Sequence, residues 1–109
     1  MRPTGTVTFL FTDIEESTRL WEQHEPATRV AVERHDRMMR ERVGEHGGYV
    51  FSTAGDAFAV AFDRAGDAVA AAVSAQRALE AEPWPSPIRV RVRMGVHTGE
   101  AHERDGDYF

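Results

Sequence analysis

The chain has 109 residues, of which 41% are hydrophobic, so one domain with a modest core is expected. Its net charge of −5 argues against nonspecific nucleic-acid binding, because no basic surplus exists to displace phosphate counterions, and no apolar run of about 18 residues predicts a membrane span. Cysteine and lysine are absent, which excludes disulfides, thiolate sites and phosphate-binding lysines; without a signal-peptide pattern, this composition favours a cytoplasmic location.

The first half of the chain predicts one strand, two helices and a second strand. Residues 6–11 are mostly β-branched or aromatic over a short run, which indicates a buried strand. Ser17 or Thr18 can cap a first short helix, and a proline in the first turn begins a second helix over residues 26–43. A pair of glycines ends that helix, and residues 49–51 then form a short strand.

The next segments predict a turn, a strand and a long helix. Residues 53–56 have the composition of a turn and lead into a strand at residues 57–62. An alanine-rich helix follows over residues 65–79, and the helical spacing places Val69 and Val73 on its apolar face.

A last strand is predicted at residues 88–96, where apolar side chains alternate with arginines that leave one face in water. Residues 97–99 end or turn this strand, and the polar residues that follow would open a hairpin. Arg93 belongs to the row of arginines on the wet face. A solvated surface is the first interpretation of that row, and contact with a partner is the second.

The order of elements, β-α-α-β-β-α-β, is typical of a split βαβ or ferredoxin-like domain. We therefore expect a single α+β domain with an antiparallel-rich sheet and helices packed on one face. In this topology the strand at 57–62 lies between the strands at 6–11 and 49–51 and runs antiparallel to both. The end of the first strand then meets the start of the strand at 57–62, so Asp13 and Asp56 are expected to converge.

Two carboxylates at adjacent strand ends suit Mg²⁺ or Mn²⁺, since these ions prefer oxygen ligands and leave positions open for phosphate oxygens. Two such ions on Asp13 and Asp56 can activate an attacking hydroxyl and neutralise a leaving pyrophosphate, and the carbonyl of Ile14 could add a ligand. Backbone amides at the start of the first helix could bind a polyphosphate. These amides belong to Glu15, Glu16, Ser17 and Thr18. The alternative is that Asp13 caps a helix and Asp56 is a turn residue.

Three segments carry a resemblance to a known family. The segment Phe11–Trp21 (FTDIEESTRLW) resembles the first metal motif of the class III adenylate and guanylate cyclases. Gly55–Phe58 together with Phe62 resembles their second metal motif, and Arg93–Gly99 (RMGVHTG) resembles the strand and turn that follow it. The resemblance covers essentially the whole chain. It implies that residues 1–109 are one domain of nucleotide cyclase fold, truncated so that the C-terminal part is missing.

The resemblance implies a two-metal mechanism. Two Mg²⁺ or Mn²⁺ ions on Asp13 and Asp56 would bind a nucleoside triphosphate, either ATP or GTP. The ribose 3′-hydroxyl would attack the α-phosphorus and release pyrophosphate and a 3′,5′-cyclic nucleotide for signal transduction. Family members act as head-to-tail dimers, in which one subunit supplies the metal acids and the other supplies base-reading residues, an asparagine and an arginine. A homodimer, or a heterodimer with another cyclase domain, is therefore implied.

The chain departs from the family pattern at three places. Ser52 stands four residues before the second metal acid, where a base-reading lysine is usual, so the choice between ATP and GTP stays open. Glu16 stands where the family turn usually has glycine, and a side chain can restrict that turn. The chain stops at Phe109, before the second base-reading position, the asparagine and the arginine.

Two functions fit this uneven pattern. The chain can be the metal-binding half of a purine nucleotide cyclase, in which case the 109 residues by themselves are expected to have little or no activity. The alternative is a catalytically inactive cyclase-homology module that regulates, or pairs with, another protein.

Overall fold

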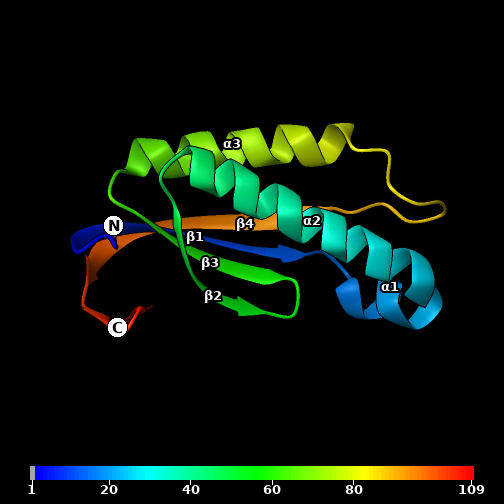
Figure 1. The fold of residues 1–109 in the computed structure, drawn as a ribbon, viewed down its shortest axis with the longest axis horizontal. Coiled ribbons are helices and arrows are strands. Elements are labelled where there is room, and N and C mark those ends of the chain that lie inside the picture. The colour runs from blue at the N-terminus through cyan, green and yellow to red at the C-terminus, as the bar shows by residue number, and fades with distance from the viewer. Residues whose placement is uncertain (1) are drawn as a thin grey trace.

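A four-stranded antiparallel sheet with helices on one of its faces forms the body of the protein (Figure 1). The computed structural model describes residues 2–109. This architecture confirms the predicted α+β, ferredoxin-like fold. The elements in chain order are β1 (Gly5–Ile14), α1 (Ser17–Gln23), α2 (Glu25–Glu45), β2 (Tyr49–Ala54), β3 (Ala57–Phe62), α3 (Ala65–Ala81), β4 (Val92–Ala101), β5 (Glu103–Arg104) and β6 (Asp107–Tyr108).

The strand order in the main sheet is β2-β3-β1-β4, so β3 lies between β1 and β2 and is antiparallel to both, as predicted. Thr12 of β1 is paired with Phe58 of β3, which brings the C-terminal end of β1 beside the start of β3. On its other side β1 pairs with β4 over its whole length, as far as Ile14 opposite Val92. This second pairing carries β1 beyond the predicted end at residue 11.

The bounds of β4 differ most from their prediction. The sequence predicts a strand at 88–96 and a turn at 97–99, whereas β4 runs from Val92 to Ala101. Residues 97–99 stay in the strand because they pair with the first half of β1. Residues 88–91 have no partner strand in the described chain, because β1 ends at Ile14 and turns away into α1. Their apolar side chains are buried nevertheless, which explains the alternation in the sequence.

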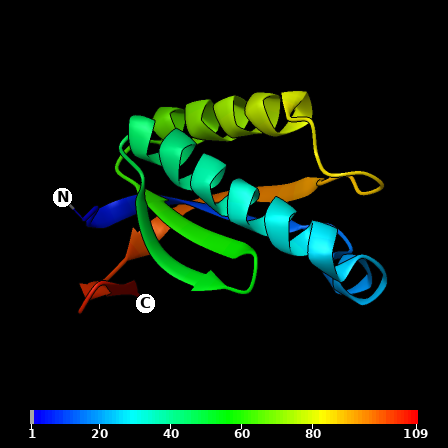
Figure 2. The same cartoon turned by 45° about the vertical axis from the view of Figure 1, so that its right-hand side comes forward.

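The helices α2 and α3 cover one face of the sheet, which the two views in Figures 1 and 2 show and which confirms the predicted layering. Large buried side chains from each layer fill the space between helices and sheet, among them Leu10, Met39, Phe62 and Leu79. The helices therefore support the sheet from one side. Its strand ends carry the candidate site.

The helix α3 packs against the sheet through small side chains. Ala68, Ala71 and Ala75 are buried at helical spacing, which lets the helix backbone approach the strands closely. Val69 and Val73 are 52% and 43% exposed, so their predicted burial is wrong. The two valines lie outside the contact between α3 and the sheet, because the side of the helix that carries the buried alanines faces the sheet.

The other face of the sheet is closed at one end by aromatic side chains. Tyr108 of β6 packs edge-on against Phe9 and Phe51, with ring centroids 5.3 and 4.8 Å apart. Its hydroxyl donates a hydrogen bond to the carbonyl of Pro3 at 2.8 Å. Burial raises the pKa of Tyr108 above its ordinary value of 10.0. The C-terminal hairpin thus covers part of this face, which we call the open face because α2 and α3 lie on the opposite one.

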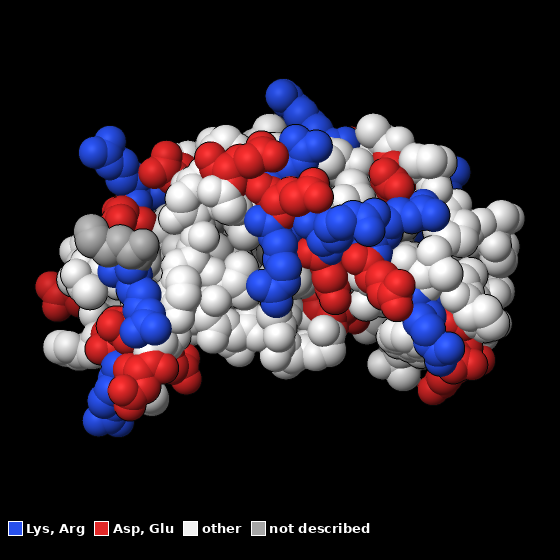
Figure 3. Space-filling view, viewed as in Figure 1, with Lys and Arg blue, Asp and Glu red and all other residues white. Residues whose placement is uncertain are grey.

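Charged side chains of both signs are mixed over the side of the molecule viewed in Figure 1, where Figure 3 shows blue and red side chains next to one another. This distribution agrees with the net charge of −5. Within the described residues, no helix is both long enough and apolar enough to cross a membrane.

Phe58 and Phe11 provide a matched test of the two faces, since Phe58 is 3% exposed in the core and Phe11 is 46% exposed on the open face. Phe58→Ala is expected to lower the free energy of unfolding by about 2–5 kcal/mol, because it removes buried contacts and leaves a cavity. Phe11→Ala should cost less than about 1 kcal/mol. Urea melts measure both changes. A loss below about 0.5 kcal/mol for Phe58→Ala would contradict its place in the core.

Candidate functional site

The ends of three neighbouring strands bring the candidate site together. Asp13 lies near the end of β1, Asp56 lies in the turn before β3, and Arg93 lies near the start of β4. The Oδ1 atom of Asp56 accepts a hydrogen bond from the backbone N–H of Ile14 at 2.8 Å. Asp56 is thus bonded to the residue next to Asp13, and the two acids converge as the topology predicts.

A tight hairpin turn holds Asp56 in place. Ala54 and Ala57 pair across the turn between β2 and β3, and Gly55 and Asp56 are its central residues. Gly55 has a φ of 61°, in the left-handed region that a two-residue hairpin turn requires and that glycine adopts without steric cost. The turn therefore carries the Asp56 carboxylate to the backbone of β1 at Ile14.

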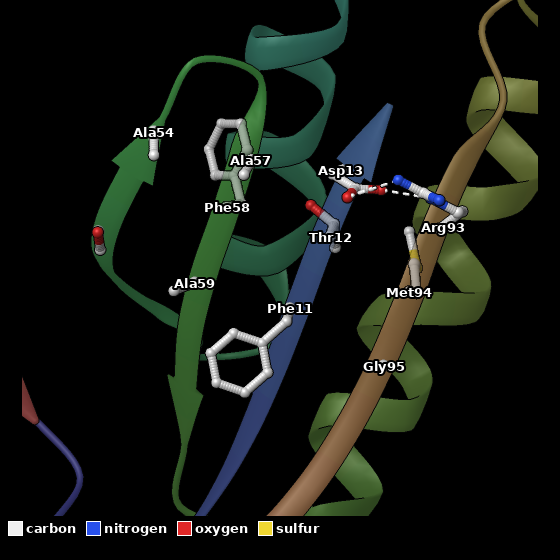
Figure 4. A pocket seen from close by; sticks show the side chains of 11 residues that line it. Phe11, Thr12, Asp13, Ala54, Ala57, Phe58, Ala59, Arg93, Met94 and Gly95 are labelled. Atoms are coloured by element: carbon white, nitrogen blue, oxygen red, sulfur yellow. Dashed lines mark hydrogen bonds and ion pairs between the residues drawn. The ribbon is translucent and has the colours of Figure 1, made fainter. Parts of the chain in front are cut away.

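Both carboxylate oxygens of Asp13 are bound by Arg93 (Figure 4). The Nε of Arg93 donates to Oδ1 at 2.8 Å and Nη2 donates to Oδ2 at 2.9 Å, which is the bidentate geometry that suits a guanidinium and a carboxylate. The hydrogen bond and charge of Asp13 raise the pKa of Arg93, and the charges of Glu15 and Asp56 add to this effect. Arg93 therefore stays cationic beside the two acids.

The sequence does not single out Arg93 as a site residue. The row of arginines predicts a solvated strand face for it, whereas the structure places it directly opposite Asp13 in the β1–β4 pairing. Side chains at paired positions of an antiparallel ladder lie on the same face and touch. The register of β4 against β1 is the signal that could have found this contact. The sequence does not reveal that register, because the pattern begins the strand at residue 88 instead of Val92.

Two adjoining hollows border the acids. The first, of 420 Å³, lies on the open face and is floored mainly by small residues, with Phe11 at one side (Figure 4). The small residues of its lining are Ala54, Ala57, Ala59 and Gly95. The second hollow, of 390 Å³, lies between the strand ends and the start of α1. Its lining includes Asp13, Ile14, Glu16, Ser17, Thr18, Asp56 and Arg93. Most of the predicted site residues thus share one hollow.

The turn before α1 contains a strained residue. Glu16 precedes the helix with a φ of 56°, a left-handed conformation that costs about 1 kcal/mol for a residue with a Cβ and that glycine adopts freely. This conformation explains why a glycine suits the position. The Glu16 carboxylate pairs with Arg19 at 2.9 Å. The predicted capping by Ser17 or Thr18 is wrong, because α1 begins at Ser17 and no side chain caps it.

Ser52 lies on β2 and lines the same hollow as Asp13. A bulge between Val50 and Ser52 shifts the register of β2 against β3, so that Ser52 lies opposite Ala59. Since an antiparallel pair shares one face, Ser52 joins the small residues on the floor of the open face. It supplies a hydroxyl there, without charge.

The donor set of the site fits Mg²⁺ or Mn²⁺. Asp13, Asp56 and the carbonyl of Ile14 offer oxygen atoms, and the described residues contain no cluster of three or more His, Cys, Asp or Glu that could enclose an ion. Two carboxylates with open positions suit ions that keep water or phosphate oxygens as ligands. They do not suit zinc, which takes three or four nitrogen, sulfur or carboxylate ligands from the protein.

The sequence matches the adenylate and guanylate cyclase catalytic domain over residues 1–104. The chain belongs to this family. A search of curated proteins gave no match. The structure of an adenylate cyclase from Trypanosoma brucei superposes with a TM-score of 0.87 at 28% sequence identity, covering 99% of this chain and 64% of that one.

Two further solved cyclases share the fold. An adenylate/guanylate cyclase/hydrolase from Silicibacter pomeroyi superposes with a TM-score of 0.74 at 27% identity, over 95% of this chain and 62% of its own. The guanylate cyclase domain of RhGC from Catenaria anguillulae, solved in complex with GTP, superposes with a TM-score of 0.80 at 18% identity, over 94% and 60%. The present chain thus spans less than two thirds of the length of these solved cyclase chains.

The hydrogen bond between Asp56 and Ile14 leads to a stability prediction. Asp56→Ala is expected to lower the free energy of unfolding by about 1–2 kcal/mol, because the Ile14 N–H loses its charged acceptor. Asp56→Asn keeps an oxygen at the same place and should lose less than half of that amount. Chemical denaturation of the two variants and the wild type measures the difference. Equal losses for both variants would contradict the role of this hydrogen bond.

Proposed function

We propose that this chain is the metal-binding half of a purine nucleotide cyclase that converts ATP or GTP into a 3′,5′-cyclic nucleotide and pyrophosphate. The observation that carries the proposal is the meeting of Asp13 and Asp56 at adjacent strand ends in a domain of the cyclase family. A signalling role, in the cytoplasm where nucleoside triphosphates are available, is part of the proposal.

Each residue at the strand ends has a proposed role. Asp13, Asp56 and the Ile14 carbonyl would hold two ions of Mg²⁺ or Mn²⁺, which would supply activation of the ribose 3′-hydroxyl and neutralisation of the leaving pyrophosphate. The backbone amides of residues 16–18 bind the polyphosphate where the chain turns into α1. The amide of Glu15 is not part of this set, because it donates a hydrogen bond to the carbonyl of Arg91 at 2.8 Å. The pairing of Glu16 with Arg19 supports this role, because it offsets a carboxylate that would otherwise repel phosphate.

The nucleoside part of the substrate is proposed to lie on the open face, in the hollow lined by Phe11 and Ser52. Ser52 occupies the base-recognition position and can donate or accept one hydrogen bond, which favours neither purine by charge. A second cyclase domain, in a homodimer or heterodimer, is proposed to cover this face and to supply the groups that bind the triphosphate in the transition state. Helices leave this face uncovered, which supports the proposal.

The competing proposal is a catalytically inactive cyclase-homology module that serves in regulation or dimerisation. Two observations favour it: Asp13 is bound on both oxygens by Arg93, and Ser52 replaces the base-reading lysine of the family. Binding of a partner that is independent of Asp13, without any affinity for nucleotide, would support this module in place of the enzyme.

Metal-dependent nucleotide binding separates the two functions. With Mn²⁺ present, the chain is expected to bind a fluorescent, non-hydrolysable triphosphate analogue, and a chelator should abolish the signal. Asp13→Ala should weaken binding at least about tenfold, because a charge partner of the metal is lost. Asp63→Ala, which removes an exposed acid at the far end of β3, is the matched control and should have no effect. Binding that is unchanged in Asp13→Ala would contradict the metal role.

Cyclase turnover by the 109 residues alone is expected to be very low. The asparagine and arginine that the family uses in the transition state cannot be assigned among these residues. The purified chain is assayed with Mn²⁺ and either ATP or GTP for the cyclic nucleotide, and Asp13→Ala serves as the blank for contaminating activity. Robust turnover that Asp13→Ala abolishes would contradict this prediction while supporting the metal site.

A further inference from the structure

The contact between Arg93 and Asp13 is built into the fold. The two residues face each other directly in the β1–β4 ladder, and their side chains join through two hydrogen bonds of 2.8 and 2.9 Å. A bidentate pair of this kind uses both oxygens of the carboxylate. In this arrangement Asp13 has no oxygen that is unengaged, whereas Asp56 is bonded through Oδ1 to a neutral backbone amide.

A divalent ion at Asp13 conflicts with this contact. The ion needs a lone pair of a carboxylate oxygen, and the guanidinium already occupies one lone pair on each of the two oxygens, so the ion and Arg93 compete for the same carboxylate. It would also place two positive charges beside the positive charge of Arg93, and like charges at such short range repel. Deprotonation of Arg93 does not remove this repulsion. Asp13 raises the pKa of Arg93, so the guanidinium remains charged.

We propose that Arg93 is a latch on the metal site: it holds the Asp13 carboxylate and must leave before Asp13 can bind an ion. The inference rests on the proposed metal role of Asp13 and adds a form of regulation to it. Because metal and Arg93 compete for Asp13, the latch raises the concentration of divalent ion at which the site fills. Asp56 is held by Ile14 independently, so only one of the two acids is gated in this way.

The latch can open without disturbing the fold. The side chains of Arg93 and Asp13 are 66% and 43% exposed, so water can replace the bonds that each loses. An exposed ion pair contributes little to stability, and a dication with a better geometry can displace it. Glu15 and Asp56 add negative charge around the pair, which favours the more highly charged of the two competing cations.

Binding of Mn²⁺ alone, without nucleotide, tests the latch. Free Mn²⁺ is followed by electron paramagnetic resonance at constant ionic strength for the full chain and its variants. Arg93→Met is expected to tighten Mn²⁺ binding roughly threefold to fivefold, the size of effect when one exposed ion pair stops competing. Arg93→Lys, which keeps the charge but loses the fork, should lie between Arg93→Met and the wild type. Thermal melts verify that each variant is folded.

Arg91→Met is the matched control. It removes the same charge two residues away, from an exposed arginine that lines neither hollow at the acids, and should change Mn²⁺ binding less than about 1.5-fold. Equal tightening in Arg91→Met and Arg93→Met would overturn the latch in favour of a general charge effect.

Asp13→Ala separates failure of the latch from failure of the metal role. If Asp13→Ala abolishes Mn²⁺ binding while Arg93→Met leaves it unchanged or weaker, the latch is overturned and the metal role stands. If no variant binds Mn²⁺ in a manner that depends on Asp13, the metal role fails and the latch fails with it.

Discussion

The double pairing of β1 is the constraint on which the rest of the site depends. β1 pairs with β4 along its whole length and with β3 from Thr8 to Thr12. Because side chains alternate along a strand, a slip of one residue in either pairing would turn the neighbouring side chains to the opposite face. The observed registers put Asp13 and Arg93 on the same face and bring the turn that holds Asp56 to the end of β1.

The two faces of the sheet have different roles: one packs against the helices, and the other carries the candidate site. On one face, large side chains such as Leu10 and Phe62 are completely buried under α2 and α3, which fixes the strands firmly. On the other, alanines and a glycine leave a hollow of 420 Å³ beside the acids. A site on strands that are packed from behind keeps its geometry better than a site on mobile loops. The two acids can therefore be well ordered although no helix of the described chain covers the open face.

The sequence predicts the fold and the meeting of the acids, and it fails where strand register decides the outcome. The bounds of β3 and the convergence of Asp13 with Asp56 follow from local pattern and from one topological rule. The start of β4 does not follow from the local pattern. Residues 88–91 alternate like a strand, but β1 ends opposite Val92 and leaves them without a partner strand in the described part of the chain. Arg93 is missed for the same reason, since its contact joins positions 80 residues apart through that register. Whether the acids bind metal remains a proposal.

Electrostatics explain why the two acids are held so differently. Two carboxylates that converge repel each other, so each needs a compensating partner when no cation lies between them. Asp56 obtains part of this compensation from the amide of Ile14, which leaves its charge largely available. Asp13 obtains it from the full charge of Arg93, which suits the folded chain but competes with a second cation at the same oxygens. If Asp13 binds metal as proposed, the contact that stabilises this acid is thus also the contact that the ion must displace.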